Sequence, residues 1–370
     1  MLPHMSKLWI QLPFLVLAIV PRAAYGQNAD GIGHAKCAEY RNIPLPTEAA
    51  SIPLPKDWPI CASYKLYSGI GTRVDLEAAR RCAWSERLAA QAGLAPKYTL
   101  ESVFGGSAML TVLYANGEGV ERSIPLALRF ACETNFDGDF DDIESLHLEA
   151  HGKRPKFVLC NEAKTEFSIG FCAGYQQQID DQERESTYRK ISEQWPAAHK
   201  AAFEKLLVAE ANYAKAHATG ETELSGSGRA VWEINSEESI KDDFLSAINA
   251  FETDRAIPKS SSADAATSEA TISHLLEGTL ATAEAKKSGY GAIQPEGIQK
   301  AEQAWLIYRT AWIEFSKLHY PSVSVDAWLT LLTKDRIDIL KDVQCYAGIS
   351  DEPCDPDGPE EDGRTPRPLP

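Results

Sequence analysis

Residues 297–320 carry the clearest structural signal in the chain and read G-I-Q-K-A-E-Q-A-W-L-I-Y-R-T-A-W-I-E-F-S-K-L-H-Y. Apolar and aromatic residues recur there at steps of three and four: Ala301, Ala304, Trp305, Tyr308, Trp312, Phe315 and Leu318. This spacing predicts a helix of about five turns with one apolar face, which must pack against another element. Pro321 ends the helix, because proline cannot continue it.

A second amphipathic run follows after a short turn. Residues 325–340 read V-D-A-W-L-T-L-L-T-K-D-R-I-D-I-L, with apolar side chains at Trp328, Leu331, Leu332, Ile339 and Leu340. The two runs together predict a helical hairpin. Helical periodicity is common in the rest of the chain, whereas the alternation typical of strands is scarce. We therefore expect an all-α fold, in which short helix-turn-helix repeats precede helical hairpins or a bundle, stapled by disulfides.

The hairpin contains an ordered motif, A-x-x-A-W-x-x-Y-R followed by R-x-x-x-L. It falls on Ala301, Ala304, Trp305, Tyr308, Arg309, Arg336 and Leu340. The motif resembles the C-terminal signature of the LprI-type lysozyme-inhibitor family of bacterial envelope proteins. The string E-T-E-L-S-G-S-G-R-A at residues 221–230 is similar to a segment of longer LprI-like proteins, so the resemblance extends through the middle of the chain.

This resemblance implies an exported, non-enzymatic module that binds a protein partner, such as a basic lysozyme-type cell-wall hydrolase, and blocks it. It also implies the candidate binding positions Trp305, Tyr308, Arg309 and Arg336. Because these residues lie on the packed face, we expect most of them to belong to the core. Trp305→Ala would then unfold the hairpin, at a cost of about 3–5 kcal/mol.

The N-terminus predicts export. Residues 1–26 combine the positive Lys7, an apolar run over residues 8–20, and the small residues Ala24 and Gly26 before a cleavage site, which together are typical of a secretory signal. That run is too short to span a bilayer, and no later segment approaches the necessary length. We expect a periplasmic or secreted protein without membrane insertion. The net charge of −16 argues against nucleic-acid binding and favours either a basic partner or plain solubility.

Eight cysteines follow the predicted cleavage site. An even number in an exported chain predicts up to four disulfides, and none of the spacings is the C-x-x-C of zinc or redox sites. Three pairs are favoured: Cys61–Cys82, Cys160–Cys172 and Cys345–Cys354. The short loops that they close favour the last two, and a staple between facing helices favours the first. The pairing of Cys37 and Cys132 stays open, as does the oligomeric state.

A weak internal repeat lies within residues 58–135. Ser68-Gly69-Ile70-Gly71 followed by Asp75 recurs 48 residues later as Asn116-Gly117-Glu118-Gly119 followed by Ser123. Each glycine pair suits a turn between helices, and Asp75 and Ser123 suit the N-caps of the helices that follow. These strings resemble the Sel-one-like repeat, a tetratricopeptide-related unit that stacks into binding scaffolds.

The middle of the chain contains tempting but incomplete motifs. Residues 136–151 hold six carboxylates, yet the calcium-loop pattern fails at its sixth and twelfth positions, and H-L-E-A-H at 147–151 is not the zinc-hydrolase motif. Ser225 lies in a turn between helices without the strand that a nucleophile elbow needs. We therefore expect no catalytic residue, metal or cofactor.

Composition and periodicity divide the chain into seven parts: a signal peptide at 1–26, an N-terminal extension at 27–57, Sel-one-like repeats at 58–135, a helical middle region at 136–252, a linker at 253–269 with helix returning near Ala270, an LprI-like helical domain at 270–345, and an acidic, proline-rich tail at 346–370. Two functions compete with the inhibitor hypothesis. One is an envelope scaffold or adaptor that binds another exported protein through the repeats, and the other is a helical hydrolase whose Glu and His residues lie far apart in sequence.

Overall fold

The computed structural model describes residues 37–59, 61–134, 156–253, 255, 257–285 and 292–346, and within them every regular element is helical. This confirms the predicted all-α fold. Several sequence predictions lie outside the described residues: the signal at 1–26, the acidic stretch at 136–151 with its two histidines, Cys354, and the tail beyond residue 346. No helix in the described ranges has the length and apolar character needed to cross a membrane.

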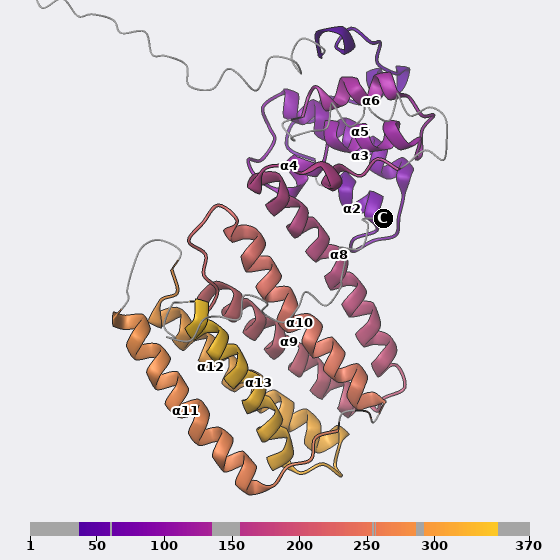
Figure 1. Ribbon diagram of the computed structural model, residues 1–370. Coiled ribbons are helices and arrows are strands. Elements are labelled where there is room, and N and C mark those ends of the chain that lie inside the picture. The colour runs from indigo at the N-terminus through magenta and orange to yellow at the C-terminus, as the bar shows by residue number, and fades with distance from the viewer. Residues whose placement is uncertain are drawn as a thin grey trace, which may run out of the picture.

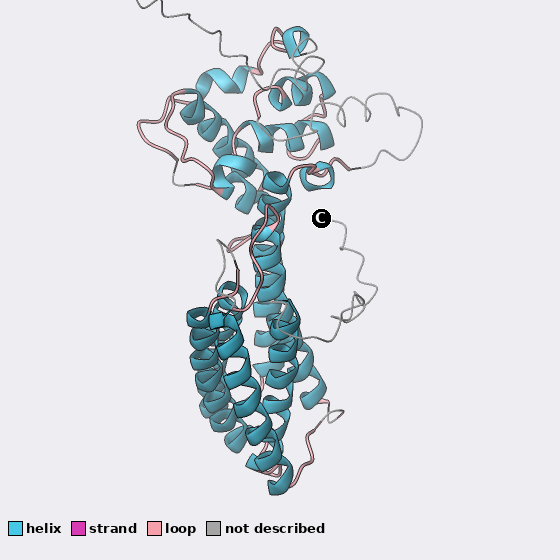
Figure 2. Cartoon of the chain, turned by 60° about the vertical axis from the view of Figure 1, so that its left-hand side comes forward, coloured by secondary structure: helices cyan, strands magenta, loops and turns pink. Residues whose placement is uncertain are grey.

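The described residues form two lobes (Figures 1 and 2). The first, here called the repeat lobe, comprises residues 37–134 and the 3-10 helix η2 (Leu159–Glu162). Its elements are short: the 3-10 helix η1 (Thr47–Ser51) and the helices α2 (Ser63–Ser68), α3 (Leu76–Gln91), α4 (Leu100–Phe104), α5 (Ser107–Asn116) and α6 (Ile124–Ala131). They enclose one core, in which Tyr64, Trp84, Leu110 and Phe130 are almost fully buried.

The internal repeat has a structural counterpart in this lobe. The turn between α2 and α3 places Gly69 and Gly71 at positive φ, and the turn between α5 and α6 does the same with Gly117 and Gly119. Three backbone hydrogen bonds or caps recur at the same offset of 48 residues. In the first unit, Asp75 N–H donates to the Leu66 carbonyl, and in the second Ser123 N–H donates to the Tyr114 carbonyl. Likewise, Ile70 N–H donates to the Lys65 carbonyl, and Glu118 N–H donates to the Leu113 carbonyl. The side chains of Asp75 and Ser123 each cap the helix that follows them. The two helix-turn-helix units are therefore superimposable in their hydrogen bonding.

Three disulfides fix this lobe. Cys61–Cys82 joins the start of α2 to α3 and Cys160–Cys172 joins η2 to the next helix, as the sequence favoured. The pairing left open is resolved as Cys37–Cys132, which ties the beginning of the described chain to the end of α6. Cys345 is also disulfide-bonded, but its predicted partner Cys354 lies outside the described residues.

The second lobe, here called the bundle, is built from six long helices: α8 (Glu166–Ser192), α9 (Ala197–Gly220), α10 (Arg229–Glu252), α11 (Ser262–Ala285), α12 (Pro295–His319) and α13 (Val325–Tyr346). Figure 1 shows α8 starting beside the repeat lobe and continuing along α10, so that one helix belongs to both lobes. Thr165 begins α8 with a capping box completed by Ser168.

The predicted hairpin is present as α12 and α13, but each helix packs most closely on an earlier one. α12 runs antiparallel to α9, with Phe315 against Phe203 at one end and Gly297 against Gly220 at the other. α13 packs on α11, where Gln344 donates to Thr279. The apolar face of residues 297–320 therefore finds its partner in the middle region, and the two regions share one aromatic core.

The predicted extent of the linker is wrong. Helix α11 begins at Ser262 instead of near Ala270, so residues 262–269 are helical. Ser261 explains the difference, because its hydroxyl accepts from Asp264 N–H while the Asp264 carboxylate accepts from Ser261 N–H. This reciprocal cap starts a helix in a stretch whose low hydrophobicity indicated none.

Candidate functional site

The four candidate binding residues, Trp305, Tyr308, Arg309 and Arg336, lie on α12 and α13 of the bundle, and Tyr308 and Arg309 are partly buried. Trp305 and Arg336 are buried, with Arg336 fully so. The Arg336 guanidinium donates from Nη1 and Nη2 to both carboxylate oxygens of Glu221, at 2.7 and 2.6 Å, and from Nε to Glu302 at 3.1 Å. One arginine on α13 thus joins the end of α9 to α12 by a bidentate, charge-assisted pair.

Charge compensation governs this cluster. Burial alone would raise the pKa of Glu221, but the adjacent Arg336 and the 2.9 Å contact from His217 outweigh it and hold that pKa below its usual value. Burial raises the pKa of Glu302, which accepts a hydrogen bond from Arg336 Nε. The pair of Arg336 and Glu221 is therefore ionised and fully enclosed, which suits a structural role.

The other two positions support the same packing. Tyr308 accepts from Trp312 Nε1 at 2.6 Å and stacks on Tyr213 with ring centroids 5.5 Å apart. Arg309 lies over the Trp305 ring, 4.6 Å from its centroid, and pairs with Glu269 on α11. These contacts agree with the expectation that most of the family-matching residues belong to the core.

A large accessible hollow lies on the repeat lobe. It is a groove of about 670 Å³ between the second half of α3, the loop at 95–98, the α4–α5 corner, residues 133–134 and the start of α8. Its volume is within the range typical of ligand and side-chain pockets. Three aromatic residues line it: Trp58, Tyr98 and Phe167.

Tyr98 is the unusual residue of this groove. Its φ of 56° is the only positive value among the described non-glycine residues, and its side chain is 75% exposed. The ring meets the edge of Phe167, itself 48% exposed, at a centroid distance of 5.9 Å. A bulky residue in the left-handed region is strained, and strain of this kind gathers at binding sites. Sequence analysis missed this residue because nothing local marks it.

The floor of the groove is polar and internally paired. Arg87 forks onto Glu133 with distances of 2.6 and 2.7 Å, and Ser107 donates to the same carboxylate. Beneath them the buried Glu86 accepts from the Ser63 backbone and hydroxyl and from Gly106 N–H. Arg87, Glu133 and Glu86 therefore serve as supports, whereas the exposed Lys97 and the aromatic rim offer the contact area.

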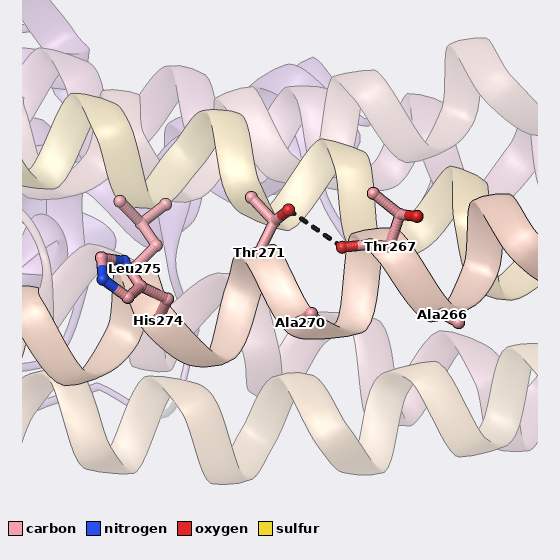
Figure 3. A pocket seen from close by; sticks show the side chains of 6 residues that line it. All are labelled: Ala266, Thr267, Ala270, Thr271, His274 and Leu275. Carbon is pink, nitrogen blue, oxygen red and sulfur yellow. Dashed lines mark hydrogen bonds between the residues drawn. The ribbon is translucent and has the colours of Figure 1, made fainter.

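Another hollow lies on the bundle surface, but its lining does not come from several elements. Figure 3 shows its lining of Ala266, Thr267, Ala270, Thr271, His274 and Leu275, all from α11. The Thr271 hydroxyl donates a hydrogen bond to the Thr267 carbonyl at 2.9 Å. Because one helix supplies every side chain, no polar groups converge there from different elements.

One cluster of potential metal ligands fails on chemical grounds. The Cys61 and Cys82 sulfurs and the Glu86 carboxylate lie within 4.8 Å of one another, but both sulfurs belong to a disulfide. Metal binding by cysteine requires the thiolate, so this trio cannot hold an ion while the bond is intact.

Comparisons of the chain with protein-family models, with curated proteins and with solved structures find no match. The LprI-like and Sel-one-like resemblances therefore rest on the quoted motifs alone.

Proposed function

We propose that this chain is an exported, non-enzymatic protein-binding module, similar to lysozyme inhibitors, that blocks a cell-wall hydrolase. The observation that carries the proposal is the groove of the repeat lobe, with Tyr98 held in a strained conformation and presented to solvent beside Phe167. We place the contact surface in this groove, because Trp305 and Arg336 are buried and Tyr308 and Arg309 are partly buried.

The groove suits a protein partner because of how its parts are fixed. Tyrosine provides a large, rigid, amphipathic contact, and such residues dominate the binding energy of many interfaces. Here the support is covalent, since Cys61–Cys82 and Cys160–Cys172 constrain α3 and the start of α8 that flank the groove. A preformed surface loses little conformational entropy on binding.

The charge of the chain adds selectivity. At a net charge of −16, the protein attracts a basic hydrolase over long range and repels acidic partners. An inhibitor working in this way would lose affinity as salt screens the attraction.

The first test is the lysis of a bacterial cell-wall suspension by a basic lysozyme, with and without the oxidised mature protein, at low and moderate salt. We expect inhibition that weakens with salt and disappears in Tyr98→Ala and Phe167→Ala. Ile307→Ala, which removes a 64% exposed side chain from α12, is the matched control and should inhibit like the parent chain. Absence of inhibition at a clear molar excess would refute the inhibitor role.

A second candidate function is an envelope scaffold or adaptor that uses the helical repeats. The hydrogen-bond pattern shared by the two helix-turn-helix units favours it, because stacked units of this kind form binding surfaces for other proteins. A photo-crosslinker at position 98 of the full chain, with the same group at position 307 as control, distinguishes the two. A cell-wall hydrolase crosslinked only from position 98 supports inhibition, and a different exported protein supports the adaptor.

A further inference from the structure

A histidine pair lies at one end of the bundle, remote from the groove. His199 is in the first turn of α9, and His319 is the last residue of α12. Their Nδ1 atoms face each other at 2.8 Å. The two helices run antiparallel, which brings together residues separated by 120 positions in sequence.

A carboxylate fixes the orientation of one ring. Glu252, the last residue of α10, accepts from His319 Nε2 at 3.1 Å and from the Tyr320 hydroxyl at 2.5 Å. Because a carboxylate accepts, Nε2 of His319 carries the hydrogen and its Nδ1 presents a lone pair toward His199. Metal-binding histidines are held in this way, with the second ring nitrogen donating to a carboxylate.

Aromatic packing holds the same ring in place. Phe315 stacks on His319 with an interplanar angle of 13°, and Trp195, in the turn before α9, lies with its ring centroid 4.0 Å away. The His319 side chain keeps 11% of its exposure, so water has access to the site. The nearby Lys200 is turned away, with its ammonium donating to the Glu193 carbonyl.

We propose that His199 and His319 form a binding site for a divalent transition-metal ion of the zinc class, with Glu252 positioning His319. Imidazole nitrogen suits zinc, nickel and copper, whereas magnesium and calcium prefer oxygen. Two nitrogens bound to tetrahedral zinc at about 2.0–2.1 Å lie roughly 3.3 Å apart, so the present spacing has to open by only about half an ångström. Water fills the remaining positions.

Binding needs no net proton release when both rings are neutral. In the metal-free protein the hydrogen between the two Nδ1 atoms belongs to His199, since His319 carries its own on Nε2. When a metal binds, His199 moves that hydrogen to its Nε2, and both Nδ1 lone pairs point to the ion. The ion then connects the ends of α9 and α12, with α10 attached through Glu252.

The test titrates zinc chloride into the full mature chain, oxidised and without a histidine tag. His147→Ala and His151→Ala are introduced into every variant, since that pair lies outside the described residues and could compete. We expect one zinc per chain by calorimetry, a zinc-dependent rise in Tm, and no response to magnesium chloride. His199→Asn and His319→Asn should each weaken zinc binding at least about tenfold, and Glu252→Gln about tenfold as well.

His274→Ala removes an exposed histidine of α11 and serves as the control, with unchanged zinc affinity expected. Nitrogen-15 NMR of the histidine rings supplies a readout that does not depend on variant folding, because zinc should move the Nδ1 resonances of His199 and His319 together. Absence of zinc binding, or binding that survives His199→Asn and His319→Asn unchanged, would overturn the proposal.

Discussion

The repeat lobe and the bundle differ in helix length: the α-helices have 5 to 16 residues in the repeat lobe and 22 to 27 in the bundle. They also differ in cysteine content. The repeat lobe contains the disulfides Cys37–Cys132 and Cys61–Cys82, whereas residues 173–344 contain no cysteine. A short helix buries little apolar area, and cross-links compensate by restricting the unfolded chain. A long amphipathic helix buries enough side chains to hold its place by packing.

Between Cys172 on α8 and Cys345 on α13, the bundle is held by aromatic rings and enclosed charge. Trp312 stacks on Trp328 at 5.3 Å, and Phe244 and Phe251 meet the same cluster edge-on. Arg336 on α13 then connects three helices, because it pairs with Glu221 at the end of α9 and with Glu302 on α12. The two lobes should therefore lose stability under different treatments. Reduction should destabilise the repeat lobe, and loss of a single buried charge should destabilise the bundle.

Reduction of the disulfides should produce the largest difference in stability between the two lobes. Closing the long loop between Cys37 and Cys132, 95 residues apart, is worth about 4–5 kcal/mol to the repeat lobe in the chain-entropy account. We expect a reductant to abolish hydrogen-exchange protection in α3 and α5 while α9 and α12 remain protected, as measured by mass spectrometry. Equal loss in both lobes would show that the bundle depends on the repeat lobe or on the disulfide of Cys345.

Removing one buried charge should affect mainly the bundle. Arg336→Met leaves the Glu221 carboxylate enclosed without its partner, which costs about 3–5 kcal/mol. Lys341→Met on the same helix breaks the exposed pair with Asp338 and should cost less than about 1 kcal/mol. Urea denaturation measures both. If the double change Arg336→Met with Glu221→Leu were no more stable than Arg336→Met alone, the charge explanation would fail.

A second buried carboxylate gives the bundle a pH dependence. Burial, only partly offset by Lys241 and Arg184, raises the pKa of Glu210 to about 7, and among the described residues its Oε1 has no hydrogen-bond partner. Asp181 and Glu237 face it as well and add to the upward shift. Because the folded pKa exceeds the unfolded one, the native state binds the proton more tightly, and stability falls as pH rises from about 4.5 to 7.

The loss over that interval should be on the order of 3 kcal/mol. Glu210→Gln removes the ionisation, so the variant should gain on the parent chain progressively between pH 5 and pH 8. Urea midpoints at unit steps of pH provide the measurement. A difference between the two proteins that stayed constant with pH would contradict the assignment.

Most helices of the fold could be predicted from local sequence patterns. The three- and four-residue steps of residues 297–320 predicted α12, and the two G-x-G turns with Asp75 and Ser123 predicted the repeat units. The linker prediction was wrong from Ser262 onward. It was based on the low average hydrophobicity of the stretch, whereas Ser261 and Asp264 form a cap that starts a helix there.

The candidate sites were much less predictable. Arg336 and Glu221 are 115 residues apart and His199 and His319 are 120 apart, so only the packing of α9 against α12 and α13 brings the partners together. The groove likewise draws on Trp58, Tyr98 and Phe167 from separate segments. Periodicity indicates which face of a helix is buried, but it says nothing of which helix covers that face.

Two glycines test how tightly the bundle helices pack. Gly297 on α12 touches Gly220 at the end of α9, and a Cβ at 297 would lie 2.6 Å from the Gly220 carbonyl oxygen, part of a backbone that cannot turn aside. Gly297→Ala should therefore destabilise the bundle by about 1–2 kcal/mol, despite the higher helix propensity of alanine. In α11, a Cβ at Gly278 would meet its nearest neighbour, the flexible Gln344 amide, at 3.9 Å, so Gly278→Ala should stabilise the bundle by up to about 1 kcal/mol. Thermal unfolding of the two variants measures this difference in sign. Stabilisation by both changes would mean that α9 and α12 can separate freely at this end, and the bundle would then need another source of rigidity.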